Sequence, residues 1–157
     1  MGKEITRSYV SFQPNGDQFI AFISLDAVSA EDRDLEVVLR DAADCYGDHI
    51  RAMRVLIEEM RENRMRRMPV FARRMWVLGD QVLRLIEHLS LLGLELDGVY
   101  DHLSRDLGVK RKWLEKAVIF RRHIPVVDAI PESLKWGKCE KGTRKKAERI
   151  MKGEPVN

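Results

Sequence analysis

Cationic side chains gather in one short stretch of the chain, KRKWLEKAVIFRR, at residues 110–122. Lysine and arginine neutralise the phosphates of nucleic acids, and arginine can also pair with two atoms of a guanine edge. We therefore predict DNA contacts from Lys110, Arg111, Lys112, Trp113, Lys116 and Arg121. Trp113 would be a base or sugar contact or a core residue, and we favour partial exposure. The alternative for the whole stretch is an ordinary helix with a solvated basic face.

The spacing of apolar residues places this stretch on the second of two helices. Leu103 and Leu107 share one helix face, and Gly108 can end the first helix in a left-handed conformation. In the second helix, apolar residues repeat at Leu114, Ala117 and Val118. Ser104 and Ala117 are small where the two helices would cross. The pattern predicts a helix-turn-helix over about residues 97–122, whose second helix can lie in the major groove.

Two other basic clusters could flank this motif. One is the segment RENRMRRMPVFARR at residues 61–74, and the other is the tail at residues 135–152. We predict flanking phosphate contacts from Arg66 and Arg67 in the first cluster and from Lys145 and Lys146 in the second. The alternatives are cations that complement a helix dipole in the first cluster and a solvated chain end in the second.

Charge is distributed unevenly along the 157 residues, although the net charge is only +3. Residues 1–60 hold 6 Lys and Arg against 12 Asp and Glu, whereas residues 61–157 hold 22 against 13. A polyanion would therefore be attracted by the second part and repelled by the first. The acidic first part remains available for a protein partner.

The first part of the chain begins with a predicted β-hairpin. Residues 4–25 hold two runs rich in β-branched and aromatic residues, and Asn15-Gly16 between them is a strong turn signal. An isolated hairpin is marginally stable, so this one should pack on its own helices, pair with the hairpin of a second chain in a dimer, or form part of a partner interface. Ser29 can then cap a helix, and residues 30–67 follow as one long helix or two consecutive ones.

The second part is predicted to be helical. Pro69 should end the preceding helix and can lie in the first turn of a helix over Val70–Leu92. Asp97 would then cap the first helix of the helix-turn-helix. The fold class is therefore mainly α, with an N-terminal β-hairpin followed by a helical bundle that contains a helix-turn-helix. We divide it into residues 1–68, a possible dimerisation or interaction region, and residues 69–157, the helix-turn-helix domain with a basic tail.

Several classes of protein do not fit the sequence. No apolar run approaches the ~20 residues that span a bilayer, and the first residues lack a secretory signal, so we expect a cytoplasmic protein. Cys45 and Cys139 should then be free thiols. We predict a structural role for His49, which lies on the edge of an apolar stripe without a cysteine, histidine or carboxylate at ligand spacing. We predict no metal or other cofactor, because the side chains of the adjacent pairs Glu87-His88 and Asp101-His102 diverge on a helix. No pair of catalytic carboxylates or phosphate-binding loop is found, so we do not expect an enzyme.

Two families share short patterns with the second part. One segment resembles the N-terminal helical domain of YhcG-type PD-(D/E)xK nucleases, because it has the same motif residues in the same order. These are Trp76, Leu78-Gly79, the run Leu103-Ser104-Arg105-Asp106-Leu107, Phe120 and Pro125. The resemblance implies a DNA-associated helical module. The connecting turn is shorter here, and the nuclease domain with its PD-(D/E)xK motif is missing, so nuclease activity is not implied.

A looser resemblance links the turn to ParB-like partition proteins. The segment is similar to their helix-turn-helix region in its turn and in the prolines that follow. The turn is Asp106-Leu107-Gly108-Val109-Lys110-Arg111, and it is followed by Pro125 and by Pro131-Glu132-Ser133-Leu134. Their arginine-rich nucleotide-binding motif is not visible, so a role in partitioning is not implied. From the residues and these resemblances we expect a double-stranded DNA-binding protein, a transcriptional regulator that acts as a homodimer. The alternative is a non-catalytic protein-interaction or assembly module without a nucleic-acid partner.

Overall fold

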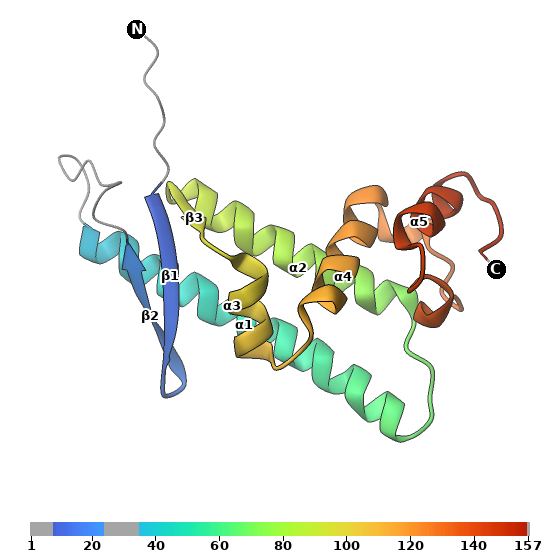
Figure 1. Ribbon diagram of the computed structural model, residues 1–157, viewed down its shortest axis with the longest axis horizontal. Coiled ribbons are helices and arrows are strands. Elements are labelled where there is room, and N and C mark those ends of the chain that lie inside the picture. Colours follow the sequence, from blue (N-terminus) through green and yellow to red (C-terminus); the bar gives the residue numbers. More distant parts are fainter. Residues whose placement is uncertain (1–7, 24–34, 157) are drawn as a thin grey trace, which may run out of the picture.

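Helices make up most of the chain, and a small sheet lies at one end (Figure 1). The computed structural model describes residues 8–23 and 35–156. Its elements are β1 (Ser8–Asn15), β2 (Gln18–Ile23), α1 (Leu35–Met65), α2 (Ala72–Leu91), β3 (Leu94–Leu96), α3 (Val99–Leu107), α4 (Arg111–His123), the 3-10 turns η2 (Val127–Ala129) and η3 (Trp136–Lys138), and α5 (Thr143–Met151). The predicted fold class, mainly α with an N-terminal β-hairpin, is confirmed.

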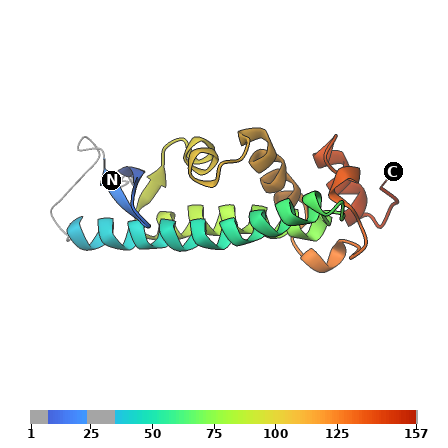
Figure 2. The same ribbon diagram turned by 90° about the horizontal axis from the view of Figure 1, so that it is seen from below.

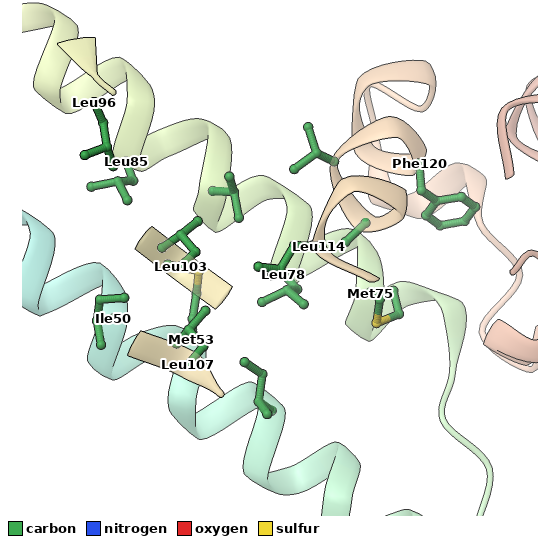
Figure 3. Packing of buried hydrophobic residues seen from close by; sticks show 14 of the residues in the cluster. Ile50, Met53, Met75, Leu78, Leu85, Leu96, Leu103, Leu107, Leu114 and Phe120 are labelled. Carbon is green, nitrogen blue, oxygen red and sulfur yellow. The ribbon is translucent and has the colours of Figure 1, made fainter. Parts of the chain in front are cut away.

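The elements form two layers around one hydrophobic core. Figure 2 shows α1 and α2 along the length of the molecule, with the sheet, α3 and α4 on one side of them. In Figure 3, Leu103 and Leu107 of α3 lie by Met53 of α1, and Leu114 of α4 lies by Leu78 of α2. The predicted division after residue 68 falls in the turn between α1 and α2, but the segments on its two sides share this core.

Residues 35–65 form one continuous helix, which resolves the choice between one helix and two. One face of α1 is buried, at Ala42, Tyr46, Gly47, His49, Ile50, Met53, Ile57 and Met60. The predicted cap at Ser29 lies outside the described residues. Helix α2 begins at Ala72 rather than Val70, so Pro69 precedes it and does not lie in its first turn. The cause is a nonlocal pairing, because Phe71 forms an antiparallel bridge with Lys135.

A third strand completes the sheet and was missed by the sequence patterns. Strands β1 and β2 pair antiparallel, with a register from Val10↔Ile23 to Asn15↔Gln18. Strand β1 also pairs in parallel with β3, from Ser8↔Leu94 to Val10↔Leu96. Strand β1 is therefore central, in the order β2-β1-β3. Because β3 occupies residues 94–96, the prediction that Asp97 caps α3 is wrong, and Gly98 precedes its first residue. A run of three residues is too short to show a recognisable strand pattern, and the strand it pairs with lies more than 80 residues away in the sequence.

The hairpin packs on α1 through aromatic rings, in agreement with the first alternative, packing on the chain's own helices. Phe12 stacks on Tyr46 with ring centroids 4.2 Å apart, and Phe19 meets the same ring edge-on at 4.9 Å. Such pairs contribute about 1 kcal/mol each beyond the area they bury. The three rings therefore fix the hairpin against the middle of α1.

Hydrogen bonds to the backbone of Phe12 hold α3 in place. Its N–H donates to His102 Nε2 at 3.2 Å, and its carbonyl accepts from Arg105 Nη2 at 2.7 Å. Tyr46 Oη donates to Asp106 Oδ2 at 2.5 Å, and Arg105 pairs with the same carboxylate. Burial and the neighbouring Asp106 carboxylate raise the pKa of Tyr46 well above its usual value, so the phenol stays protonated and remains a donor. Strand β1, α1 and α3 are thus joined by one polar network.

Substitution of Tyr46 by phenylalanine is expected to lower the free energy of unfolding by about 1.5 kcal/mol, because the buried Asp106 carboxylate loses a hydrogen bond from a neutral donor. Urea unfolding followed by circular dichroism measures the change. Tyr9→Phe is the matched control, since the Tyr9 side chain is exposed and should tolerate the change. Equal stability of Tyr46→Phe and wild type would show that the network does not contribute.

None of the described helices combines the length and the apolar character that a membrane crossing requires.

Candidate nucleic-acid interface

The turn between α3 and α4 is closed by hydrogen bonds from residues on both sides of it. Gly108 has a φ of 65°, a left-handed conformation that a side chain would strain. The N–H groups of Gly108 and Val109 both donate to Ser104 O, at 3.0 and 3.3 Å. Ser104 Oγ donates to Val109 O at 2.6 Å. Ser104 therefore closes the turn, a role that the sequence analysis did not assign to it.

The crossing that positions α4 is made with α2. Gly79 lies against Ala117, and a Cβ built on this glycine would lie 2.7 Å from the carbonyl carbon of Ala117. The buried face of α4 consists of Leu114, Ala117, Val118 and Phe120. Trp76 Nε1 donates to Ile124 O at 2.8 Å, immediately after the last turn of α4. These contacts fix both the depth and the direction of α4 on α2.

Arg121 belongs to this inner contact and not to the exposed basic face. Its Nε donates to Asp80 Oδ1 at 2.9 Å, and its guanidinium lies 4.7 Å from the centre of the Trp76 ring. Arg84 donates to the other oxygen of the same carboxylate at 2.7 Å. Because its charge is already paired, we remove Arg121 from the predicted DNA contacts. The sequence pattern could not exclude Arg121 from the DNA contacts, because it does not show which cations have an acidic partner in the fold.

The other cations predicted to contact DNA from α4 and its N-cap differ in their exposure and in whether an acid already pairs with them. Lys110 and Lys112 are exposed, and within residues 8–23 and 35–156 their side chains have no ion-pair partner. Arg111 is exposed but pairs with Asp101 at 2.9 Å and with Glu115 at 2.8 Å. Lys116 is half-buried. The N-terminal end of α4 therefore offers two positive charges without an ion pair among the described residues. A third, on Arg111, could bind a phosphate only in competition with Asp101 and Glu115.

Trp113 is half-buried, in agreement with the preference for partial exposure. Its indole N–H is enclosed and has no hydrogen-bond partner among the described residues. The ring lines a hollow of about 360 Å³ between the end of α1 and the α3–α4 turn. Arg61, Arg64 and Lys110 line the same hollow, together with the acid Glu140.

Arg61 and Arg64 were not among the predicted contacts. Arg61 Nη2 donates to Gly108 O at 3.0 Å, which brings α1 against the turn. The two arginines extend the basic surface of Lys110 onto α1. Their spacing of three residues on one helix could have indicated a common face, but the sequence does not show that this face reaches the turn.

The predicted flanking residues lie in two separate places. Arg66 and Arg67 follow α1 in its exposed connection to α2, where Arg67 has a φ of 57°. Figure 1 shows this connection at the same end of the molecule as α5 and below it. Lys145 is exposed on α5, which packs against α4. Lys146 is half-buried, and its ammonium donates to Lys138 O. Of these four predicted contacts, Lys145 is the one that is exposed, without an ion pair among the described residues, on an element that adjoins α4.

The two cysteines are free thiols, as predicted. Burial raises the pKa of each to about 11, and the Asp48 carboxylate adds to the effect at Cys45. Both thiols are therefore protonated at neutral pH.

No family model, curated protein or solved structure matches this chain. The resemblances to the YhcG-type and ParB-like families therefore stay hypotheses.

Proposed function

We propose that the protein binds double-stranded DNA through α3 and α4, with the N-terminal end of α4 directed at the major groove. The observation that carries the proposal is the exposure of unpaired Lys110 and Lys112 at that end, beside Arg61 and Arg64 of α1. A helix-turn-helix places these first residues of its second helix nearest to the bases. Lys145 and the connection with Arg66 and Arg67 would contact phosphates farther along the duplex.

We infer further that the protein acts as a homodimer and regulates transcription. One small module rarely supplies enough specific affinity, whereas two copies bind two half-sites about one helical turn apart. Within the described residues β2 is an edge strand of the sheet, and Tyr9, Ile20 and Phe22 are 49%, 44% and 46% exposed. A second copy of the chain would cover these apolar side chains. The same face supports the alternative function, a protein-interaction module, if a different protein covers it.

The test is fluorescence anisotropy of a labelled random-sequence duplex, titrated with the full chain at low and moderate salt. Binding should be micromolar at low salt and should weaken steeply as salt rises, because each neutralised phosphate releases counterions. Light scattering on the same samples measures the oligomeric state. A chain that does not bind at low salt would exclude the DNA function and favour the protein-interaction alternative.

The double variant Lys110→Glu/Lys112→Glu is expected to reduce the slope of log K against log salt by about 2, because two phosphate contacts are lost. Binding at moderate salt should then be lost, while the thermal unfolding temperature should hardly change, since both side chains are exposed.

Arg40→Glu/Arg51→Glu is the matched control for this variant, with the same change in net charge. Both arginines are exposed on α1, and among the described residues Arg40 makes a surface ion pair with Glu36 and Arg51 makes one with Asp48. Loss of such a pair costs less than about 1 kcal/mol. If this control weakens binding as much as Lys110→Glu/Lys112→Glu, the effect comes from total charge, and α4 is not the contact surface.

A further inference from the structure

Three side chains that commonly bind transition metals meet between α1 and α2. Cys45 and His49 lie four residues apart on α1, so they share one helix face, and His88 comes from α2. One donor atom from each residue lies within 4.8 Å of the other two. The prediction that no possible metal ligand lies at ligand spacing from His49 is therefore wrong, because Cys45 precedes it by about one helical turn. The third donor is 39 residues beyond His49 and joins them only when the two helices pack.

Hydrogen bonds already orient the imidazole of His49 as a ligand. Its Nδ1 lies 2.9 Å from Gln81 Oε1, which can only accept, so Nδ1 carries the proton and Nε2 has a free lone pair. That lone pair faces His88 Nδ1 at 2.9 Å. Histidines that bind metals usually donate their second N–H to an oxygen in this way, which fixes the ring and its tautomer.

The surroundings favour a cation over a neutral ligand. The cluster lines an open hollow of about 360 Å³ whose other walls are the carboxylates Asp41, Asp44 and Asp48. Asp48 also pairs with Arg51, whereas Asp41 and Asp44 have no ion pair within residues 8–23 and 35–156. The hollow is open to solvent, which gives an ion a path of entry.

We propose that Cys45, His49 and His88 bind one Zn²⁺ ion or a similar divalent transition metal. Zinc takes four ligands at about 2.3 Å from sulfur and about 2.0 Å from nitrogen, so neighbouring donors must lie roughly 3.5 Å apart. His49 Nε2 and His88 Nδ1, which are 2.9 Å apart, would have to separate slightly, and side-chain rotation would have to bring Cys45 Sγ to this spacing from within 4.8 Å of them. A water molecule or one of the three carboxylates supplies the fourth ligand.

Binding changes the protonation of two of the ligands. The Cys45 thiol loses its proton to solvent and binds as thiolate, because only the thiolate is a strong zinc ligand. The proton on His88 Nδ1, which faces the lone pair of His49, moves to Nε2 of the same ring and leaves Nδ1 free to coordinate. One proton is therefore released per ion bound. The ion joins α1 to α2 at the half of the helices nearer the sheet.

The test is titration of the full chain, without a polyhistidine tag, with Co²⁺ as a spectroscopic substitute for Zn²⁺. We expect one equivalent to bind, with a thiolate-to-cobalt charge-transfer band and the intense visible bands of four-coordinate cobalt, and Zn²⁺ should then displace it. Zn²⁺ should also raise the thermal unfolding temperature, because it binds only the folded chain. Cys45→Ser should remove the charge-transfer band, and His88→Gln should lower the affinity at least tenfold.

Two further variants separate this site from nonspecific binding. Cys139→Ala removes the other thiol, which is buried, and should keep the full cobalt spectrum. Gln81→Leu keeps all three ligands but removes the acceptor for His49 Nδ1, and such substitutions typically lower metal affinity about 10- to 100-fold. Thermal unfolding without metal verifies that each variant folds. Failure of the wild type to bind one equivalent, or a charge-transfer band that survives in Cys45→Ser, would overturn the proposal.

Discussion

Replacement of Gly79 by alanine is expected to lower the free energy of unfolding by about 3 kcal/mol, as overpacking of a tight contact does. The added Cβ would lie 2.7 Å from the carbonyl carbon of Ala117 and 2.9 Å from Cβ of Arg121, and still closer to the carbonyl oxygen of Ala117. These are mainly backbone atoms of α4, so relief requires that the helix move away from α2. The contact between Trp76 and Ile124 would be disturbed at the same time.

The sign of this effect distinguishes the close contact from ordinary helix propensity. In an open helix position, alanine in place of glycine stabilises by up to about 1 kcal/mol. Gly47 of α1 is the matched control, because a Cβ there would meet no atom nearer than the flexible end of Arg51 at 3.4 Å. Urea unfolding of Gly47→Ala and Gly79→Ala should therefore give changes of opposite sign. A neutral or stabilising Gly79→Ala would show that α2 and α4 are farther apart than described.

Replacement of Asp80 by asparagine is expected to lower the free energy of unfolding by about 2 kcal/mol. The carboxylate accepts hydrogen bonds from both Arg121 and Arg84, and its loss leaves the mostly buried Arg121 without a counter-charge. Removal of one partner from a fully buried pair costs about 3–5 kcal/mol, and the partial exposure of these two arginines reduces that figure. Arg84→Gln is the matched control, because Arg84 is 63% exposed and its loss should cost less than about 1 kcal/mol.

The contribution of Asp80 should also depend on pH. Burial would raise the pKa of Asp80, but hydrogen bonds and charges from Arg121 and Arg84 outweigh it and hold the pKa below the ordinary value of 3.8. A carboxyl whose pKa is lower in the folded chain stabilises it above its unfolded pKa, and the stabilisation is lost as pH falls through the folded pKa. The stability difference between wild type and Asp80→Asn should therefore be constant near neutral pH and shrink below about pH 4. A difference that persists in acid would assign the effect to packing.

Local patterns in the sequence determined much of the fold. Asn15-Gly16 predicted the hairpin, and the regular spacing of apolar residues predicted α1 and α2 to within a few residues. Gly108 predicted the turn between α3 and α4, since only a residue without a side chain accepts its φ of 65° without strain. Each of these features depends on residues close together in the chain, whose conformational preferences are visible in the sequence itself.

Contacts between distant residues were decided only by the tertiary structure. Strand β3 exists because β1 offers it an edge, and Gly79 meets Ala117 because α2 and α4 cross there. Packing also paired Arg121 with Asp80, so a cation of the predicted DNA surface became an internal one. It brought Arg61 to the α3–α4 turn and His88 to Cys45. The charge of a side chain and its ability to bind a metal are properties of the residue alone. Whether that charge lacks an ion pair, or that metal-binding atom lies near others, depends on which segments the hydrophobic core brings together.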